Sequence, residues 1–458
     1  MYDFVVVGGG IGGASAAAML SKNHKTLLIE KEPYLGGCSG TFSRGRYKFN
    51  IGATTFAMYQ DGMILKNFFD ECGIQFEIEK IEIPITVIQN DKTSYRYTDL
   101  KRFESHINQI YPNDGHAKFW KDIYEISKLF HQKTDFYYNK SGFFELLKTS
   151  YSFLANSLIF VPYIIKSAKK GLRDYFGELD DDFYDYLENQ FLIVAQTKIE
   201  DANFLTLALA LSYPFFDNFY VTGGMGRLFD EIEKKIYAVN KKESFLEIQN
   251  SNNTYKVKTN KGEYETKQVI FNTMYKNDFV EKKELTQSAF VVYCVIKSDK
   301  SFHHHYQIIE KNIFSYCISN SMFISFSDQN DNEMAPLGEY SVTISVHTDI
   351  GYWQNLSKED YKNRKSVVEG EILKKMCDKL NINSSQLINK FSATPQTFSR
   401  YINRQVLGGL PLKAVNFAFG FSSPKVNDFY YCGDNVFPAQ GWPGVVAGVV
   451  NLKKVLNV

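Results

Sequence analysis

The sequence predicts an α/β protein in which a parallel β-sheet forms one domain and a mixed β-sheet with helices forms a second. A strand, a glycine-rich turn, a helix and another strand follow one another at the N-terminal end. Residues 100–212 carry apolar residues at helical spacing, and short segments within 245–347 alternate apolar and polar residues as strands do. At 458 residues the chain is too long for one simple core, so two domains, or one domain with a large insertion, are expected.

Residues 2–30 have the pattern of a complete βαβ unit. The run YDFVVV is apolar and β-branched, as a buried parallel strand requires, and GASAAAMLSKN and KTLLIE supply a helix of small residues and a second strand. Gly8, Gly10 and Gly13 lie in the turn, where a diphosphate can bind over the N-terminus of the helix. Glu30 follows about 20 residues later, at the position where a carboxylate accepts the hydroxyls of an adenosine ribose. This context favours a Rossmann-like dinucleotide site over a turn with no ligand.

A second glycine-rich loop follows in KEPYLGGCSGTFSRGRYKFNIGATTF. An acid followed by the paired Gly36 and Gly37 resembles the second fingerprint of FAD-dependent oxidoreductases of the amine oxidase and phytoene desaturase superfamily. The resemblance implies that these glycines let the backbone approach the diphosphate and that Gly52 to Thr54 lie beside the flavin. A nicotinamide enzyme has no need of this loop, so FAD is the predicted cofactor.

The C-terminal end carries a further signal in DFYYCGDNVFPAQGWPGVVAGVVNLKKVL. A strand over 429–432 is followed by Gly433 and Asp434, then by a loop, and a helix is expected to begin near Pro443. Proline suits the first helical position because the donor it lacks is unpaired there anyway. The N-terminal dipole of this helix would stabilise an anionic reduced flavin near N1 and C2=O.

Three separated blocks indicate the family. FSRYINRQVLGGLPL and SSPKVNDFYYCGDNVFPAQGWPGVVAGV look like the C-terminal blocks of the carotenoid isomerase, phytoene desaturase and retinol saturase group, and NFYVTGGMGRLFDEI looks like its central glycine block. The resemblance implies that Asp434 holds the ribityl–diphosphate part of FAD and that Gln440 to Val445 border the isoalloxazine. The predicted cofactor-binding residues are Gly8, Gly10, Ile11, Gly12, Gly13, Glu30, Lys31, Gly36, Gly37, Cys38, Gly52, Ala53, Thr54, Gly433, Asp434, Gln440, Gly441, Trp442, Pro443, Gly444 and Val445.

Cys38 departs from the family pattern, because many relatives carry arginine after the paired glycines. The departure leaves a charge-assisted contact to the flavin in doubt, and covalent attachment of flavin through this thiol is disfavoured.

Trp442 is expected to add a bulky apolar surface close to the flavin ring, where a polyene could stack. Arg400 and Arg404 could meet an acidic group of substrate or FAD, or could form ion pairs that fix the C-terminal segment.

The segment 143–173 admits two interpretations. Its run FLANSLIFVPYII is shorter than the roughly 20 residues that a membrane-spanning helix needs and is interrupted by polar residues and proline. Basic residues follow at Lys166, Lys169, Lys170 and Arg173, so the segment could be a face that dips into a membrane to collect a lipophilic substrate. A buried helix that ends in a solvated basic turn is the favoured alternative, because a long apolar helix usually belongs to the core.

The composition excludes several partners. The formal net charge of +1 lacks the basic excess that nucleic-acid binding requires. The six cysteines are scattered without a C-x-x-C pair, which favours reduced thiols over disulfides or a zinc site. The histidines at 303–305 are adjacent, and neighbouring side chains on a strand point to opposite faces, so a metal site is disfavoured. The start MYDF has no signal-peptide pattern, and a cytoplasmic protein with reversible membrane contact is expected.

The predicted domain organisation is discontinuous. An FAD-binding domain comprises 1–85, 214–290 and 395–458, and a substrate domain comprises 86–213 and 291–394, including the helical insertion 100–212.

The predicted function is FAD-dependent oxidation or reduction at carbon–carbon double bonds of a lipophilic polyene or isoprenoid, with hydride transfer at flavin N5. Desaturation, saturation and isomerisation stay open, and no catalytic residue is assigned. One alternative is an amine or amino-acid oxidase, which usually needs an aromatic cage or an arginine clamp. A non-catalytic prenyl- or lipid-binding protein of the same fold is another, and the intact glycine loops argue against it.

Overall fold

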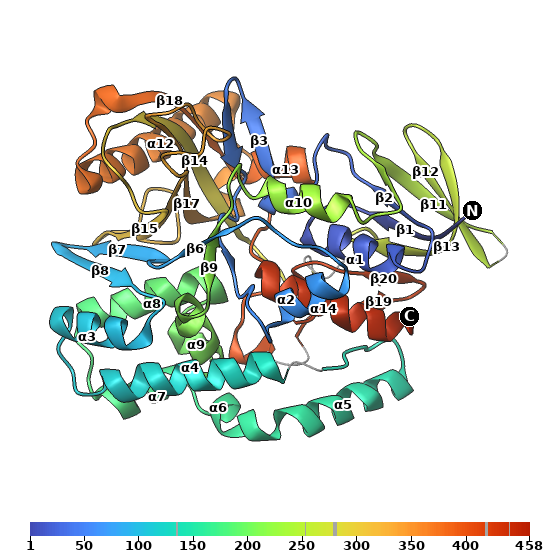
Figure 1. The fold of residues 1–458 in the computed structure, drawn as a ribbon, viewed down its shortest axis with the longest axis horizontal. Coiled ribbons are helices and arrows are strands. Elements are labelled where there is room, and N and C mark those ends of the chain that lie inside the picture. Colours follow the sequence, from blue (N-terminus) through green and yellow to red (C-terminus); the bar gives the residue numbers. More distant parts are fainter. Residues whose placement is uncertain (134–135, 252, 278–281, 417–419, 439) are drawn as a thin grey trace.

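The computed structural model describes residues 1–133, 136–251, 253–277, 282–416, 420–438 and 440–458. It contains two large β-sheets with helices packed on them, and a layer of helices runs along one side of the molecule (Figure 1). The predicted α/β fold is therefore confirmed. The domain division stays a prediction, and residues 278–281 of its first domain lie outside the described residues.

The first sheet is built on the N-terminal βαβ unit. Strand β1 (Tyr2–Val7) pairs in parallel with β2 (Thr26–Ile29) on one side and with β13 (Glu263–Phe271) on the other. Helix α1 (Ile11–Ser21) packs close to β1, since a Cβ atom on Gly13 would lie 1.9 Å from the carbonyl oxygen of Gly8. Only glycine permits this approach, which sets the helix N-terminus directly above the end of β1.

Strands from distant parts of the chain complete this sheet. Its order is β10 (Ala238–Asn240), β2, β1, β13, β12 (Thr254–Thr259) and β11 (Phe245–Ser251). Strand β20 (Phe429–Tyr431) pairs in parallel with β13 and antiparallel with β19 (Lys425–Val426). Helices α2 (Ile64–Glu71), α10 (Gly226–Glu233) and α14 (Gly441–Leu456) share one apolar core with α1. Helix α14 begins at Gly441, near Pro443 as predicted, and Pro443 is its third residue.

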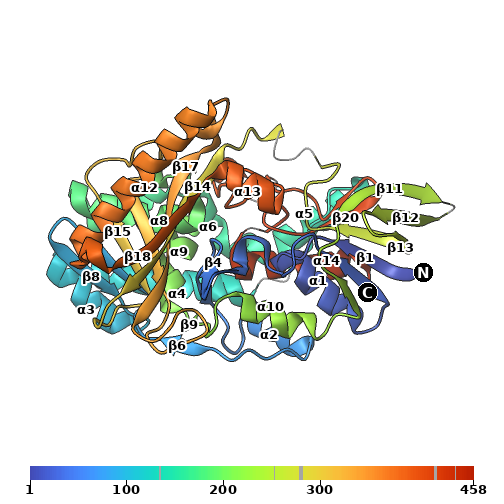
Figure 2. The same cartoon turned by 90° about the horizontal axis from the view of Figure 1, so that it is seen from above.

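The second sheet forms one wall of the site. Its order is β18 (Leu387–Ala393), β14 (Gln287–Lys297), β17 (Glu339–Asp349), β16 (Ser321–Phe326), β15 (His305–Ile309), β7 (Ile85–Gln89) and β8 (Lys92–Arg96). Helix α12 (Lys358–Leu380) covers its outer face through a core that includes Val342 and Ile344 of β17. Figure 2 shows α12 and the shorter α13 (Pro395–Ile402) along the strands β14 and β17.

The stretch 100–212 is helical, as its periodicity predicts. Its helices are α3 (Leu100–Ile110), α4 (His116–Gln132), α5 (Phe143–Ser157), α6 (Val161–Ile165), α7 (Ala168–Phe176), α8 (Asp181–Ala195) and α9 (Phe204–Ser212). Helices α4 and α9 are central, with Trp120, Ile123, Leu205 and Leu207 fully buried among them. No helix within the described residues is both long and apolar enough to cross a membrane.

Helix α5 contradicts the interpretation of segment 143–173 as a buried helix. Of its fifteen residues only Thr149 is buried, whereas Phe143 is 71% exposed, Phe144 77% and Leu154 60%. Figure 1 shows α5 and α6 at the lower edge of the molecule. The apolar spacing that predicts the helix is therefore correct, but most of its apolar side chains are exposed.

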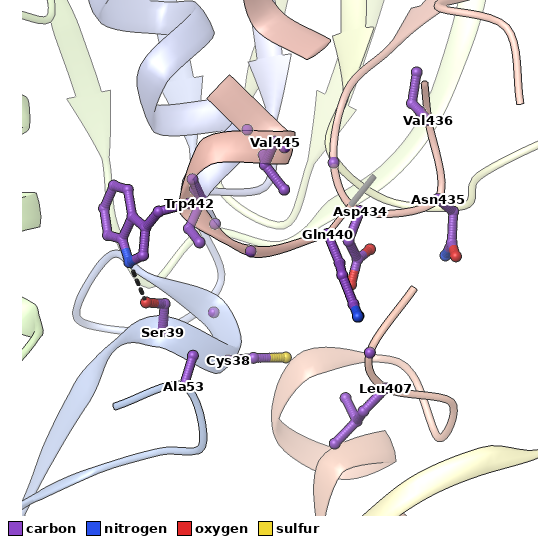
Figure 3. A pocket seen from close by; sticks show the side chains of 18 of the residues that line it. Cys38, Ser39, Ala53, Leu407, Asp434, Asn435, Val436, Gln440, Trp442 and Val445 are labelled. Carbon is purple, nitrogen blue, oxygen red and sulfur yellow. Dashed lines mark hydrogen bonds between the residues drawn. The ribbon is translucent and has the colours of Figure 1, made fainter. Parts of the chain in front are cut away.

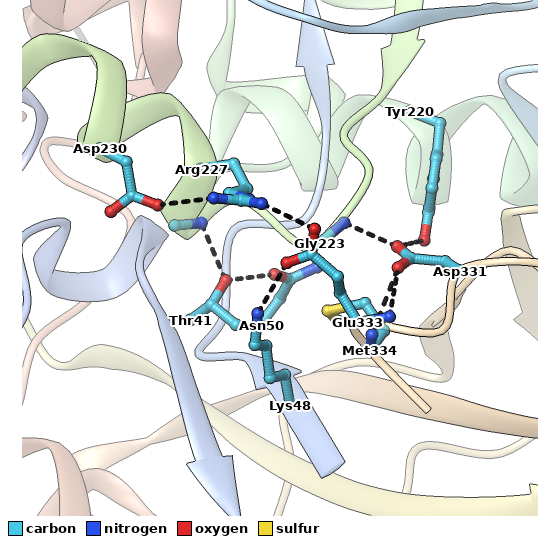
Figure 4. Close-up of polar contacts among 11 residues, drawn as sticks. Thr41, Lys48, Asn50, Tyr220, Gly223, Arg227, Asp230, Asp331, Glu333 and Met334 are labelled. Atoms are coloured by element: carbon cyan, nitrogen blue, oxygen red, sulfur yellow. Dashed lines mark hydrogen bonds and ion pairs between the residues drawn. The ribbon is translucent and has the colours of Figure 1, made fainter. Parts of the chain in front are cut away.

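The central glycine block joins the two sheets. Small strands support it, namely β3 (Thr41–Arg44), β4 (Tyr47–Asn50), β5 (Phe56–Ala57), β6 (Glu79–Ile81) and β9 (Asn218–Tyr220). The buried carboxylate of Asp331 accepts hydrogen bonds from Gly223 N at 2.7 Å and from the hydroxyl of Tyr220 at 2.6 Å (Figure 4). Met225 N donates to Asn50 Oδ1 at 2.9 Å, and Gly226 N donates to Thr41 Oγ1 at 2.8 Å. These contacts connect α10 and the segment before it with β3, with β4 and with the loop that precedes β17.

Candidate functional site

A cavity of about 980 Å³ lies between the two sheets and the helical layer. One end is formed by the glycine turn after β1, the loop after β2 and the segment that leads from β20 into α14. The other end is formed by the helical layer and the second sheet. All of the predicted cofactor-binding residues except Gly13 line this cavity, so the fold brings together segments from both ends of the chain.

Glu30 holds the two glycine loops in place. Its carboxylate accepts hydrogen bonds from Gly9 N at 2.7 Å and from Glu32 N at 2.9 Å. Burial raises the pKa of Glu30 above its ordinary value, and these two backbone donors oppose the shift. Gly36 N donates to the carbonyl of Gly9 at 2.8 Å, which ties the second loop to the first. The geometry presents a carboxylate and bare backbone at the edge of β1 and β2, as a dinucleotide requires.

The C-terminal block meets the first glycine turn. A Cβ atom on Gly12 would lie 2.8 Å from the backbone nitrogen of Gly433, so the two segments are in direct contact. Gly433 has a φ of +117°, a conformation that side chains disfavour. The pattern of close glycines leaves room above the N-terminus of α1 for phosphate groups, which backbone N–H groups there can bind.

Asn272 is a site residue that sequence reasoning missed. With its amide oriented so that both ends are satisfied, its oxygen accepts from Gly10 N at 3.1 Å and its nitrogen donates to the carbonyl of Cys432 at 3.3 Å. Asn272 lines the cavity and directly follows β13, the parallel neighbour of β1. The signal was available, because ligands bind at the carboxyl ends of parallel strands and this polar residue follows the strand ending VIF.

Cys38, Asp434 and Gln440 extend toward one region of the cavity (Figure 3). Burial raises the pKa of the Cys38 thiol to about 11, with the positive charge of Arg404 opposing the shift. The thiol is therefore protonated at neutral pH, which is unfavourable for nucleophilic attachment of a flavin. Gln440 Nε2 donates to the carbonyl of Val194 at 2.6 Å and so links the start of α14 to the helical layer.

Arg404 forms an ion pair inside the site. Its Nη1 lies 2.8 Å from Oδ1 of Asp434, and its Nε donates to the carbonyl of Val406 at 2.7 Å. Burial would lower the pKa of Arg404, but attraction to Asp434 raises it, so the guanidinium stays charged. Of the two predicted alternatives, the ion pair that fixes the C-terminal segment is present, and it sits in the cavity wall. Arg400 is exposed and contacts the ring of Tyr401 instead.

Trp442 does not form the open apolar surface that was expected close to the flavin ring. Its indole is only 3% exposed and donates to Ser39 Oγ at 3.1 Å. Phe56 and Phe229 pack against it, with ring centroids 5.3 Å and 5.2 Å away. Trp442 therefore anchors the start of α14 in the core and does not offer a broad open surface to a polyene.

The far end of the cavity is mostly apolar. The helical layer contributes phenylalanine and leucine side chains, and the second sheet contributes small and polar side chains from β14 and β17. The apolar helical residues are Phe130, Phe153, Phe160, Ile164, Leu205 and Leu209. Such a wall can bind a long hydrocarbon by removing it from water.

The adjacent histidines occupy three different environments. His303 Nδ1 lies 2.6 Å from Thr86 Oγ1, His304 stacks on Tyr220 with centroids 4.4 Å apart, and His305 Nδ1 lies 3.0 Å from Ser325 Oγ. Among the residues that the structure describes, no group of three or more His, Cys, Asp or Glu side chains is arranged to hold a metal ion.

The fold and the cavity define a Rossmann-type α/β protein. Residues 6–72 match the family model of an NAD(P)-binding Rossmann-like domain. Over its full length the chain resembles a solved putrescine oxidase bound to putrescine, with a TM-score of 0.62 at 14% identity, covering 100% of this chain and 98% of the other. An oxidoreductase from Methanosarcina mazei gives a TM-score of 0.61 at 16% identity, with 100% of both chains covered. At these identities the comparisons show the fold.

The chain is a relative of carotenoid isomerases and desaturases. It is 23% identical to the chloroplastic prolycopene isomerase of Daucus carota, with 96% of this chain and 77% of the relative covered. It is 25% identical to a 1-hydroxycarotenoid 3,4-desaturase of Flavobacterium, with 97% and 96% covered. The predicted resemblance to this family is thereby confirmed.

Proposed function

We propose that the protein is a non-covalent FAD-dependent oxidoreductase that acts on carbon–carbon double bonds of a lipophilic polyene or isoprenoid. The observation that carries the proposal is a single cavity that joins a dinucleotide-type glycine cradle to an apolar chamber. The relatives named as a prolycopene isomerase and a hydroxycarotenoid desaturase support the same class of substrate.

The residues present fit FAD. Glu30 would accept the adenosine ribose, the N–H groups around Gly10 to Gly13 would bind the diphosphate, and Asp434 would meet the ribityl chain. Gly52 to Thr54 and the N-terminus of α14 would border the ring, where the helix dipole favours negative charge. Bound FAD supplies hydride transfer, and the apolar wall would exclude water and hold an unsaturated chain against it.

The proposal is tested under anaerobic conditions. FAD-loaded protein is photoreduced and mixed with candidate polyenes or, in parallel, with primary amines, and products are separated by chromatography. We expect altered polyenes, whether isomerised, saturated or, with oxidised flavin, desaturated. Failure to alter any polyene would overturn the proposal. Amine turnover with release of hydrogen peroxide would favour the oxidase alternative, and a purified protein without a flavin spectrum after reconstitution would favour a binding protein.

The exposed apolar side chains of α5 and α6 form a surface suited to a membrane. We define this α5–α6 surface by Phe143, Phe144, Leu147, Tyr151, Leu154, Leu158 and Ile165, which are 52–79% exposed. Phe153, Phe160 and Ile164 of the same segment line the cavity, so the surface adjoins the apolar chamber. Exposed apolar side chains on consecutive helical segments, followed in the sequence by Lys169, Lys170 and Arg173, are typical of a face that lies in a lipid interface. We propose that the substrate enters here.

Flotation with anionic liposomes at low salt tests this surface. We expect the protein to float with the vesicles and to be released by salt, because the basic residues contribute through screened charges. Phe144→Glu should reduce the bound fraction several-fold, since it places a charge in the apolar face. Leu337→Glu is the matched control, because Leu337 is 72% exposed outside this surface. No flotation at low salt, or equal loss in both variants, would contradict the proposal.

A further inference from the structure

We propose that His347 and Ser345 form a polar recognition site for an oxygen atom, a hydroxyl or carbonyl, near one end of the polyene. The inference rests on the proposed function and narrows its substrate class to an oxygenated polyene. Both residues lie on β17 and line the cavity, two positions apart and therefore on one face of the strand.

The pattern of β17 sets these two residues apart. Val342, Ile344 and Val346 point to the opposite face and are buried in the core under α12. On β14 the residue paired with His347 is Ala289 and the residue paired with Ser345 is Val291, both on the cavity side. Small neighbours leave the imidazole and the hydroxyl accessible to a ligand.

The two groups have unused hydrogen-bonding capacity. Within the part of the chain that the structure describes, neither the His347 ring nor the Ser345 hydroxyl makes a hydrogen bond, and both residues keep some exposure to the cavity. Burial lowers the pKa of His347 to about 4, so its ring is neutral at pH 7. A neutral imidazole has one donor and one acceptor nitrogen, so it can bind a hydroxyl or a carbonyl.

Several other polar groups of the cavity are already engaged in hydrogen bonds. The Tyr213 hydroxyl donates to Thr55 Oγ1 at 3.1 Å, Gln440 donates to the carbonyl of Val194, and Ser321 Oγ accepts from Gln307 Nε2 at 3.2 Å. A hydrocarbon laid over His347 and Ser345 would remove them from water without replacing their hydrogen bonds, which costs binding free energy. An oxygen at this position avoids that cost.

The site also indicates which end of the substrate reacts. On β17, Thr343 Oγ1 donates to the carbonyl of Asn50 at 3.1 Å, beside the Gly52 segment that is predicted to border the flavin. Toward the other end of β17, Leu407 N donates to the carbonyl of Gln287, the β14 residue that pairs with Asp349 of β17. His347 and Ser345 lie between these two positions of β17, so we expect an oxygen held there to direct the neighbouring double bonds toward the predicted ring site.

The test compares two acyclic polyenes of equal length, one a hydrocarbon and one with a single terminal hydroxyl. Binding to the FAD-loaded protein is followed by the change in polyene absorbance, and conversion by chromatography. We expect the wild type to bind the hydroxylated polyene about tenfold or more tightly than the hydrocarbon. His347→Phe and Ser345→Ala should each reduce this ratio toward one, because each removes a polar group that the hydrocarbon would otherwise cover without a hydrogen bond.

His131→Phe is the matched control, because His131 lines the cavity from α4 and its pKa is also lowered to about 4 by burial. It should keep the preference for the hydroxylated polyene. Equal wild-type affinity for the two polyenes, or an unchanged ratio in His347→Phe, would overturn the inference while leaving the proposed function intact. If neither polyene binds or reacts, the proposed function itself fails.

Discussion

Gly10→Val is expected to abolish flavin binding, with a loss of affinity on the order of 100-fold or more, or about 3 kcal/mol. The backbone at Gly10 is extended, with φ −68° and ψ −177°, so valine is compatible with it. A Cβ atom there would lie 2.7 Å from the amide oxygen of Asn272, in the orientation in which that oxygen accepts from Gly10 N, at the end of a side chain that can move. The branched methyl groups would then occupy the space above the N-terminus of α1, where the diphosphate is predicted to bind.

The measurement is flavin content after reconstitution, together with the free energy of unfolding of the apoprotein. Gly370→Val is the matched control, since Gly370 lies in α12 and a Cβ atom there meets nothing within 4 Å. The control should bind flavin normally, and both variants should fold. A Gly10→Val protein that purifies with full flavin would show that the cofactor is not placed over this turn.

Arg404→Gln is expected to weaken FAD binding by roughly 10- to 100-fold, because it removes a charge-assisted contact. The substitution removes the ion pair with Asp434 and leaves a carboxylate without its cation beside the predicted diphosphate. The positive charge of Arg404 acts on the Cys38 thiol. The family resemblance implies an arginine at position 38, so we infer that Arg404 supplies this charge instead. Cys38→Arg in the Arg404→Gln background should therefore restore part of the affinity.

FAD and riboflavin affinities, measured by fluorescence quenching, separate a charge effect from a folding effect. The charge effect should weaken FAD more than riboflavin, which lacks phosphates, and should be smaller in Arg404→Lys. An equal loss for both ligands, or no recovery in the double variant, would show that the Arg404–Asp434 pair acts only by holding the chain.

Patterns among neighbouring residues predicted the parts of the fold that depend on contacts between neighbouring residues. The strand β1, the helix α1 and the glycines between them are encoded within a few neighbouring residues, because close packing at Gly13 permits no side chain. The helical stretch 100–212 was predictable for the same reason, since apolar spacing follows the helical period. The cofactor-binding residues themselves stay a prediction, although the fold places nearly all of them around one cavity.

Contacts between distant segments were not predictable from one sequence. The sequence places Asn272 at the end of a predicted strand, but its contact with Gly10 depends on β13 lying next to β1, which no local pattern states. The partner of Arg404 was left open because several acids were available along the chain. Helix α5 was misjudged for a different physical reason: the same apolar pattern suits a protein core and a lipid interface, and only the tertiary fold shows which face is covered.

The first sheet also constrains how the chain is made. Strand β13 pairs with β1 on one side and with β20 on the other, and α14 packs on α1, so the earliest and latest segments share one core. At a synthesis rate of 5–20 residues per second, the N-terminal βαβ unit waits roughly 20 to 90 s for these partners. During that interval α2 and α10 can cover part of its apolar face, but α14 is not yet available. The nascent protein is therefore exposed to aggregation or chaperone capture until the last helix leaves the ribosome.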